Sequence, residues 1–172
     1  MFEVLTLALW YILPAYVANG SAVIVHDHQP LDLGLKFFDG RPLLGKGKTI
    51  GGFLSGVIAG SVFGFIQAGL VFYFSGFLDF GIVFLAFVLS FGAMVGDSLG
   101  SFIKRRFDLK RGQAMPILDQ WDFILGAFLF AFVFGVSLPS LTEVLVILVV
   151  TPLLHIIANY IAFKCKLKGV PW

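Results

Sequence analysis

The sequence contains little cysteine and little charge. Cys165 is the only cysteine among 172 residues, so no disulfide can form within the chain, and a lone thiol of this kind is more often incidental than catalytic. Charged residues make up 13% of the chain and hydrophobic residues 59%, whereas a soluble domain is roughly 25% charged. A water-soluble chain of this length could not bury so many apolar side chains. The composition therefore predicts an integral membrane protein.

Five apolar segments are long enough to cross a bilayer, whose hydrocarbon core takes about 20 residues as a helix. They run over about residues 4–25, 49–74, 77–96, 119–138 and 141–163. No Lys or Arg precedes the first segment, so we expect a retained helix there and not a cleaved signal peptide. The loops over about 26–48 and 97–118 are long and polar, and the other two connections are minimal turns. We expect one all-α transmembrane catalytic domain over residues 1–172, with both long loops on one side.

The basic residues indicate which side that is. All twelve Lys and Arg residues fall in the two long loops or after the last apolar segment. Loops of fewer than about 60 residues that are rich in Lys and Arg remain in the cytoplasm, and both of these loops are within that length. The N-terminus is then outside and the C-terminus inside, as an odd number of spans requires. The sequence predicts a multi-pass protein of the cell membrane whose polar face is cytoplasmic.

Two features inside the apolar segments have more than one explanation. The four glycines from Gly52 to Gly64 recur every four residues, which permits close packing against a helix of this chain or of a second subunit. His155 and Asn159 lie one turn apart in the last segment, where either an interhelical hydrogen bond or a proton or ion pathway would explain them. No Lys or Arg lies at mid-membrane depth, so a transport function is disfavoured.

The second long loop and its borders combine cations with carboxylates. Cations suit phosphate oxygens, and carboxylates can hold Mg²⁺, a hard ion that keeps substrate phosphates among its ligands. The combination indicates a metal–polyphosphate site at the membrane surface. Its charged members are Asp97, Lys104, Arg105, Arg106, Lys110, Arg111, Asp119 and Asp122.

Each group of charges also has a simpler explanation. Asp119 and Asp122 share a helix face and could be favourable acids at a helix N-terminus. The Lys-Arg-Arg run could anchor the chain to anionic lipid headgroups. Asp97 is expected at the C-terminus of its helix, where an acid opposes the helix dipole, so helix stability does not explain it.

The first long loop ends in Gly45-Lys46-Gly47-Lys48-Thr49, which opens the second apolar segment. A helix N-terminus is a favourable place for phosphate. A P-loop would need glycine where Pro42 stands and a preceding strand, so that motif does not fit. We expect a phosphate-binding turn without the P-loop fold.

The two loops also carry a resemblance to a known family. The first contains Asn19-Gly20, Pro30-Leu31-Asp32-Leu33-Gly34 and Asp39-Gly40-Arg41 before the Gly-Lys-Gly-Lys-Thr element, and the second runs from Gly96-Asp97-Ser98 to Leu118-Asp119-Gln120-Trp121-Asp122-Phe123. With the five-helix plan, they resemble the CDP-archaeol synthases, which belong to the broader group of CTP:phosphatidate cytidylyltransferases. The resemblance covers essentially the whole chain.

The resemblance implies a membrane nucleotidyltransferase with Mg²⁺ as cofactor. It would transfer CMP from CTP to 2,3-bis-O-geranylgeranyl-sn-glycerol 1-phosphate, giving CDP-archaeol and pyrophosphate. The implied partners are CTP, this lipid phosphate and membrane lipids, with no nucleic acid. Catalytic and metal-binding roles are implied for Asp97, Asp119 and Asp122. The implied nucleotide- and phosphate-binding residues are Asn19, Lys46, Thr49, Lys104, Arg105, Arg106, Arg111 and Gly112.

The sequence departs from the broader group at one place and leaves two rival functions. Gln113-Ala114-Met115-Pro116 stands where the broader group has histidine and glycines before the acids. A CDP-alcohol phosphotransferase would need further aspartates, and no Asp follows Asp122. A small transporter or membrane scaffold is the non-enzymatic alternative. Binding of CTP with Mg²⁺ would separate the synthase from the scaffold.

Overall fold

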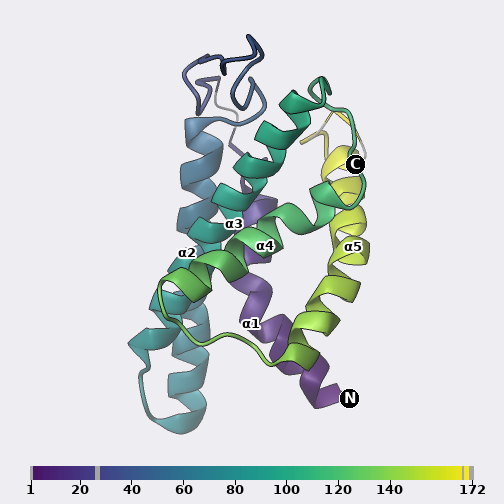
Figure 1. The fold of residues 1–172 in the computed structure, drawn as a ribbon. Coiled ribbons are helices and arrows are strands. Elements are labelled where there is room, and N and C mark those ends of the chain that lie inside the picture. The colour runs from purple at the N-terminus through teal and green to yellow at the C-terminus, as the bar shows by residue number, and fades with distance from the viewer. Residues whose placement is uncertain (1, 26–27, 168, 171–172) are drawn as a thin grey trace.

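The computed structural model describes residues 2–25, 28–167 and 169–170. These residues form five helices, which are α1 (Phe2–Ser21), α2 (Ile50–Ser75), α3 (Phe80–Arg106), α4 (Leu118–Val133) and α5 (Leu141–Lys164) (Figure 1). The described part of the chain holds no named strand, and its extended pairing is limited to isolated bridges such as that of Pro30 with Thr49. The predicted all-α fold is confirmed.

Both long connections lie at the same end of the bundle. Figure 1 places residues 28–49 and 107–117 at the top, beside the C-terminal end of α5, and the N-terminus and the two shorter connections at the bottom. Successive helices therefore run in alternating directions, as predicted. Residues 26 and 27 of the predicted first loop, and Lys168 of the basic C-terminal segment, lie outside the described residues.

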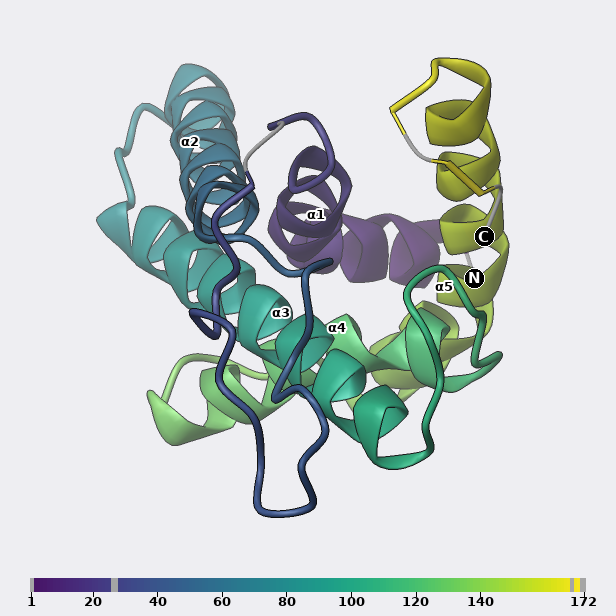
Figure 2. The ribbon, with the colours of Figure 1, turned by 90° about the horizontal axis from the view of Figure 1, so that it is seen from above.

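Four helices of the described chain, α1, α2, α3 and α5, are long and apolar enough to cross a membrane. Most of α5 faces outward, since only 11% of its most apolar window is buried inside the protein. α4 has 16 residues and spans about 24 Å, less than the roughly 30 Å of a hydrocarbon core. It runs obliquely across the bundle (Figure 2). The predicted fourth span is therefore a helix, but a shorter one than expected.

Three helix ends differ from the predicted segments. α1 ends at Ser21, before the predicted end near Val25, and α4 ends at Val133, before Leu138. α3 continues past Gly96 to Arg106. Hydropathy marks only the lipid-compatible part of a helix, and the last turns of α3 are polar because they line a cavity. The predicted loop over 97–118 is thus reduced to residues 107–117.

The glycines of α2 pack within the chain. Gly60 is buried so closely that an added Cβ would lie 2.6 Å from the carbonyl oxygen of Pro14 on α1. At Gly56 the corresponding distance to the carbonyl oxygen of Ala18 is 2.9 Å. Gly64 faces Ala86 of α3 in the same way. Of the two predicted partners for this glycine stripe, the internal one is confirmed.

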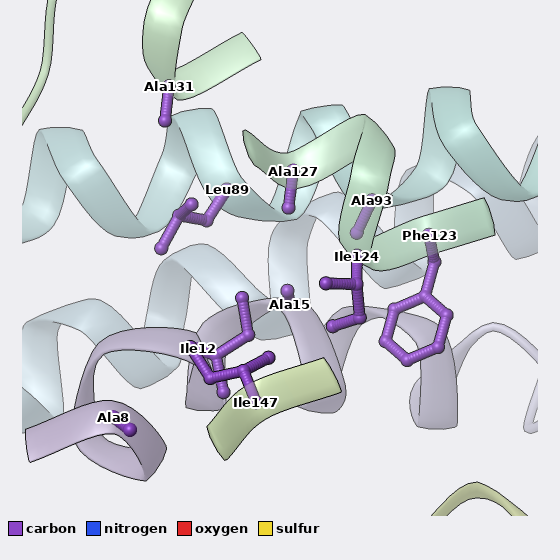
Figure 3. Packing of buried hydrophobic residues seen from close by; sticks show 10 residues of the cluster. All are labelled: Ala8, Ile12, Ala15, Leu89, Ala93, Phe123, Ile124, Ala127, Ala131 and Ile147. Carbon is purple, nitrogen blue, oxygen red and sulfur yellow. The ribbon is translucent and has the colours of Figure 1, made fainter. Parts of the chain in front are cut away.

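The hydrophobic core lies where α1, α3, α4 and α5 meet. Ile12, Leu89, Ile124 and Ile147, one from each helix, are fully buried there (Figure 3). Phe123, next to Ile124, is 1% exposed. This packing holds the start of α4 against the last turns of α3, which positions the carboxylates described below.

Candidate active site

A cavity of about 880 Å³ opens at the end of the bundle that carries the long loops. Its lining comes from every part of the chain. Asn19 lies near the end of α1, Lys46 in the first loop, Asp97 on α3, Arg111 in the second loop and His155 on α5. The fold therefore gathers distant polar residues around one space.

The first loop is organised by Asp32, which is 5% exposed. Its carboxylate accepts hydrogen bonds from the backbone N–H groups of Gly34 at 3.0 Å, Leu44 at 2.7 Å and Gly45 at 2.9 Å. Burial by itself would raise the pKa of Asp32, but these donors outweigh burial and lower the pKa below its ordinary value of 3.8. Asp32 thus fixes the chain immediately before Lys46.

The first loop meets the end of α3 and the second loop at two of its glycines. An added Cβ at Gly45 would lie 3.7 Å from the Arg105 side chain, and one at Gly47 would lie 3.7 Å from that of Arg111. Both arginines line the cavity together with Lys46. Cations of both loops therefore line one cavity, which is the arrangement that the predicted shared site requires.

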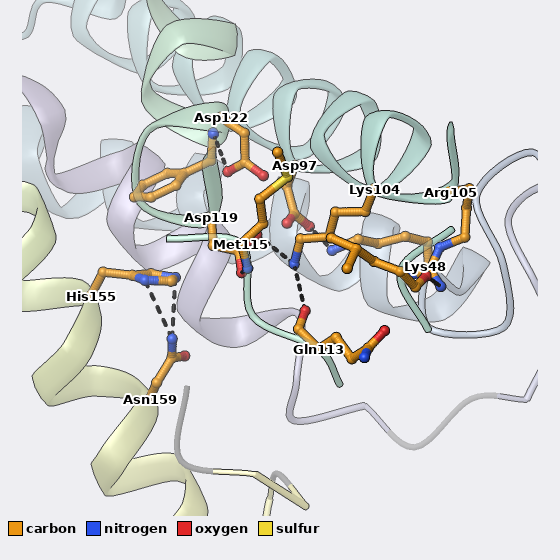
Figure 4. Close-up of polar contacts among 12 residues, drawn as sticks. Lys48, Asp97, Lys104, Arg105, Gln113, Met115, Asp119, Asp122, His155 and Asn159 are labelled. Carbon is orange, nitrogen blue, oxygen red and sulfur yellow. Dashed lines mark hydrogen bonds and ion pairs between the residues drawn. The ribbon is translucent and has the colours of Figure 1, made fainter. Parts of the chain in front are cut away.

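Two ion pairs join cations to the predicted carboxylates. Lys48 Nζ contacts Asp97 Oδ2, and Lys104 Nζ contacts Asp119 Oδ1 (Figure 4). All four side chains are less than a quarter exposed, with fractions from 17% to 24%. Paired and partly desolvated charges of this kind interact more strongly than surface pairs.

The position of Asp97 corrects one step of the sequence-based reasoning. α3 extends to Arg106, so Asp97 lies inside the helix and not at its C-terminus. The argument that an acid there opposes the helix dipole was wrong. The last turn of α3 instead carries Lys104 and Arg105, cations that the dipole favours.

Asp122 lies directly against the glycine-bearing face of α3. An added Cβ at Gly100 would overlap Oδ2 of Asp122, and one at Gly96 would overlap its backbone oxygen. Oδ1 of Asp122 accepts a hydrogen bond from the N–H of Phe123 at 2.7 Å. The absence of side chains at these two glycines is what allows this carboxylate to reach the cavity.

Asp119 lies where it can serve both of its predicted roles. Its Oδ2 accepts a hydrogen bond from the backbone N–H of Met115 at 2.9 Å, which shapes the turn before α4. Its other oxygen contacts Lys104 and faces the cavity. The structural explanation and the functional one are therefore compatible.

The carboxylates do not form a ready-made metal cluster. Among the described residues, no group of three or more His, Cys, Asp or Glu side chains is close enough to hold a metal ion. The donor chemistry nevertheless suits Mg²⁺, because hard carboxylate oxygens line a cavity with room for a polyphosphate. Two of the acids have lysine counter-ions. The arrangement fits a metal whose ligand shell is completed by substrate phosphates.

Of the predicted site residues, all but Arg106 and Lys110 line the cavity. Asn19, Lys46, Thr49, Asp97, Lys104, Arg105, Arg111, Gly112, Asp119 and Asp122 do so. Arg106 does not, and its guanidinium contacts the first loop on the outer side of α3. The phosphate-binding role predicted for Arg106 has no support in this arrangement.

Three further residues belong to the site. Lys48 is the partner of Asp97, and its place in the Gly-Lys-Gly-Lys-Thr element was a usable signal. Asp32 does not line the cavity but anchors the loop beside it, and its place between Pro30 and Gly34 could have indicated such an anchor. His155 lines the cavity, with Asn159 Nδ2 3.3 Å from its ring nitrogens and its ring stacked on Phe123 at 5.9 Å.

Comparison with known proteins agrees with these features. A family model described as CarS-like, CDP-archaeol synthase, matches residues 1–172. The CDP-archaeol synthase of Pyrococcus horikoshii is 48% identical over 165 residues, which cover 96% of this chain and 95% of that protein. That of Methanocaldococcus jannaschii is 45% identical over 99% of both chains. This chain belongs to the CDP-archaeol synthase family.

A solved structure is similar to this member of the CDP-archaeol synthase family. It is described as "Structural insight into an intramembrane enzyme for archaeal membrane lipids biosynthesis" and matches with a TM-score of 0.75 and 38% identity, over 88% of this chain and 92% of that one. Membership in the family removes the CDP-alcohol phosphotransferase, transporter and scaffold alternatives. The cavity is accordingly the candidate active site of a CDP-archaeol synthase family member.

Proposed function

We propose that this membrane enzyme transfers the CMP unit of CTP to an archaeal ether lipid phosphate, giving CDP-archaeol and pyrophosphate. The acceptor is 2,3-bis-O-geranylgeranyl-sn-glycerol 1-phosphate. The observation that carries the proposal is the cavity itself, in which cations from two loops and carboxylates from two helices lie together at the end of an apolar bundle. Membership in the CDP-archaeol synthase family supports CTP as the nucleotide and a lipid phosphate as the acceptor.

The reaction is a direct displacement at phosphorus. An oxygen of the lipid phosphate forms a bond to the α-phosphorus of CTP, and the bond from that phosphorus to the α,β-bridging oxygen breaks. Pyrophosphate leaves with the electron pair of that bond. The attacking phosphate is already ionised near neutral pH, so no side chain has to remove a proton. The protein must mainly bring two anions together and stabilise the charge that grows on pyrophosphate.

The cations of the two loops suit that task. Lys46, Arg105 and Arg111 line the cavity and can bind phosphate oxygens, Arg with two donors at once. Thr49 caps α2, accepting a hydrogen bond from Gly52 N–H at 3.1 Å, and places the positive end of that helix at the cavity. These groups would hold the nucleotide from both sides.

We assign Mg²⁺ to the carboxylates Asp97, Asp119 and Asp122. When bound, the ion would neutralise phosphate charge and so favour the approach of the second anion. Lys48 and Lys104 neutralise two of these acids in the described structure, and each ammonium could turn to a phosphate oxygen once its carboxylate has another partner. The two lysines would thereby couple metal binding to nucleotide binding.

The proposed site faces the cytoplasm. All twelve Lys and Arg residues lie in the first long loop, between Lys104 and Arg111, or from Lys164 onward, and positive charge stays on the cytoplasmic side. CTP would reach the cavity from water, while the isoprenoid chains of the acceptor remain among the helices and lipid.

Equilibrium binding tests the nucleotide half of this proposal. The purified protein in detergent should bind CTP in the presence of Mg²⁺, and a tenfold excess of ATP should compete poorly. Binding should weaken when Mg²⁺ is replaced by a chelator. Equal binding of CTP and ATP, or no binding of either, would contradict the proposed specificity.

A further inference from the structure

Arg105 and Arg106 are neighbours at the end of α3, but they face different surroundings. Successive residues of an α-helix point about 100° apart, so adjacent side chains can face different surroundings. Arg105 lines the cavity, and Arg106 does not. The Arg106 side chain is nevertheless only 19% exposed, so it is held by other groups.

Those groups are two aromatic rings and the first loop. The Arg106 guanidinium carbon lies 4.6 Å from the ring centroid of Phe102, one turn earlier in α3, and 4.8 Å from that of Phe37 in the loop. The two rings meet edge to face, with centroids 5.2 Å apart. Arg106 also donates a hydrogen bond to Asp39 Oδ1 at 3.1 Å and another to the carbonyl oxygen of Pro42. A planar, weakly hydrated guanidinium is well suited to such stacking.

A residue of the first loop also contacts the C-terminal end of α3. Arg41 donates a hydrogen bond to the backbone oxygen of Arg106, and its Nε lies 3.6 Å from Asp108 Oδ1. We call Phe37, Asp39, Arg41, Phe102 and Arg106 the arginine clasp. It joins the outer part of the first loop to the end of α3.

The clasp lies just before the residues that enter the cavity. Pro42, held by Arg106, is followed by Leu44 and Gly45, whose N–H groups bind Asp32. Lys46 comes next and lines the cavity. The segment that carries the loop cations is therefore anchored at its start by Arg106 and Asp32, and at its end by the Thr49 cap of α2.

We propose that Arg106 is a positioning residue, which acts through the arginine clasp to set the place of Lys46 and Lys48 in the nucleotide site. This inference rests on the proposed function, because it assumes that CTP is the ligand whose binding depends on those lysines. It differs from direct phosphate binding, since the Arg106 charge is engaged by Asp39 and two rings outside the cavity.

Three variants separate positioning from charge. Phe102→Leu keeps every cation but removes one ring of the clasp, and Arg106→Lys keeps the charge but loses the planar fork. Both should weaken CTP binding by roughly tenfold, as misplacement of binding groups commonly does. Lys164→Ala removes an exposed cation that does not line the cavity, and it should bind CTP as the wild type does.

Hydrogen exchange of the nucleotide-free protein supplies a second readout. The backbone amides of residues 43–48 should exchange faster in Phe102→Leu and Arg106→Lys than in the wild type, and they should be unchanged in Lys164→Ala. The inference is overturned if exchange and CTP affinity of Phe102→Leu match the wild type, or if those of Arg106→Lys do, because that variant keeps the positive charge and loses the planar fork. Wild-type protein that binds no CTP would refute the proposed function, and the exchange measurement would still test the clasp.

Discussion

At the scale of single residues, the cations and acids of this protein have two roles. Some line the cavity, and others hold the surrounding loops in place. Arg105 and Arg106 are the plainest example, because the sequence presents them as one basic run. Their separation depends on α3 remaining helical to Arg106, which hydropathy could not predict. The acids divide similarly, since Asp32 is a buried anchor for backbone amides and Asp97 pairs with a lysine.

Replacing Asp32 should loosen the first loop. Asp32→Asn keeps the shape but loses the charge that three backbone donors stabilise, so the free energy of unfolding at pH 7 should fall by about 1–3 kcal/mol. CTP affinity should fall as well, because Lys46 follows the anchored segment. Thermal unfolding in detergent, with and without CTP, measures both effects. Unchanged stability would remove Asp32 from its structural role.

The same carboxylate predicts a dependence on pH. Its pKa is lower in the folded protein than the ordinary value of 3.8, so its stabilisation is complete above that pH and is lost as the pH falls below it. Wild-type protein should lose stability below pH 3.8 through this group, and Asp32→Asn should lack that part of the loss. Comparison of the two unfolding curves against pH provides the test.

The three cavity acids should be needed for turnover. Asp97→Asn, Asp119→Asn and Asp122→Asn retain side-chain shape and remove charge, and each should reduce kcat by on the order of a hundredfold, comparable to loss of a preorganised electrostatic contact. Asp79, the N-cap of α3 at the opposite end of the bundle, is a matched control, because Asn also caps helices well. Near-wild-type turnover in all three variants would reduce these acids to caps and surface charges.

At the scale of elements, the apolar segments were predicted from hydropathy and the helix ends were not. The core and the pairing of α2 with α1 and α3 follow from apolar and small residues whose spacing is visible in the sequence. The polar turns of α3 and the early end of α4 depend on what the helices surround. A helix that leaves lipid to line an aqueous cavity gives no hydropathy signal at its true end.

Substitution of two glycines of α3 by alanine should have different effects on stability and turnover. At Gly96 an added Cβ would overlap the backbone of Asp122, so Gly96→Ala should push α4 away and destabilise the fold. At Gly100 it would overlap the Asp122 carboxylate, so Gly100→Ala should displace that side chain and lower turnover with a smaller loss of stability. Gly69, whose Cβ position is open, is the control and should tolerate Ala. Thermal unfolding and initial rates distinguish these outcomes. Equal effects of both substitutions would argue against the proposal that Gly100 makes room for the Asp122 carboxylate.

At the scale of the whole molecule, four long apolar helices form a bundle, and one end of this bundle is polar and contains the cavity. The arrangement of both long loops at one end was predictable from alternation of spans. The clustering of the acids was predicted from the charged borders of the second loop, and that of Asn19 from the resemblance. The place of His155 beside them was not, because that contact joins distant parts of the chain. Their convergence follows from the oblique path of α4 and the packing of its first turns on α3.

The orientation in the membrane can be tested with single cysteines in a Cys165→Ser background. Cysteines replacing the exposed residues Phe38 and Lys110 should be protected from an impermeant reagent added outside the cell. A cysteine replacing Ser137, which is exposed at the other end, should react. The reverse pattern would place the cavity outside and contradict the cytoplasmic assignment.

The most direct measurement follows labelled phosphorus from CTP into lipid. The purified protein is incubated with Mg²⁺, 2,3-bis-O-geranylgeranyl-sn-glycerol 1-phosphate and CTP labelled at either the α- or the γ-phosphorus. Label from the α position should enter the lipid fraction, and label from the γ position should appear only in pyrophosphate. Lipid labelled from the γ position, or no labelled lipid from α-labelled CTP, would contradict cytidylyl transfer at this site.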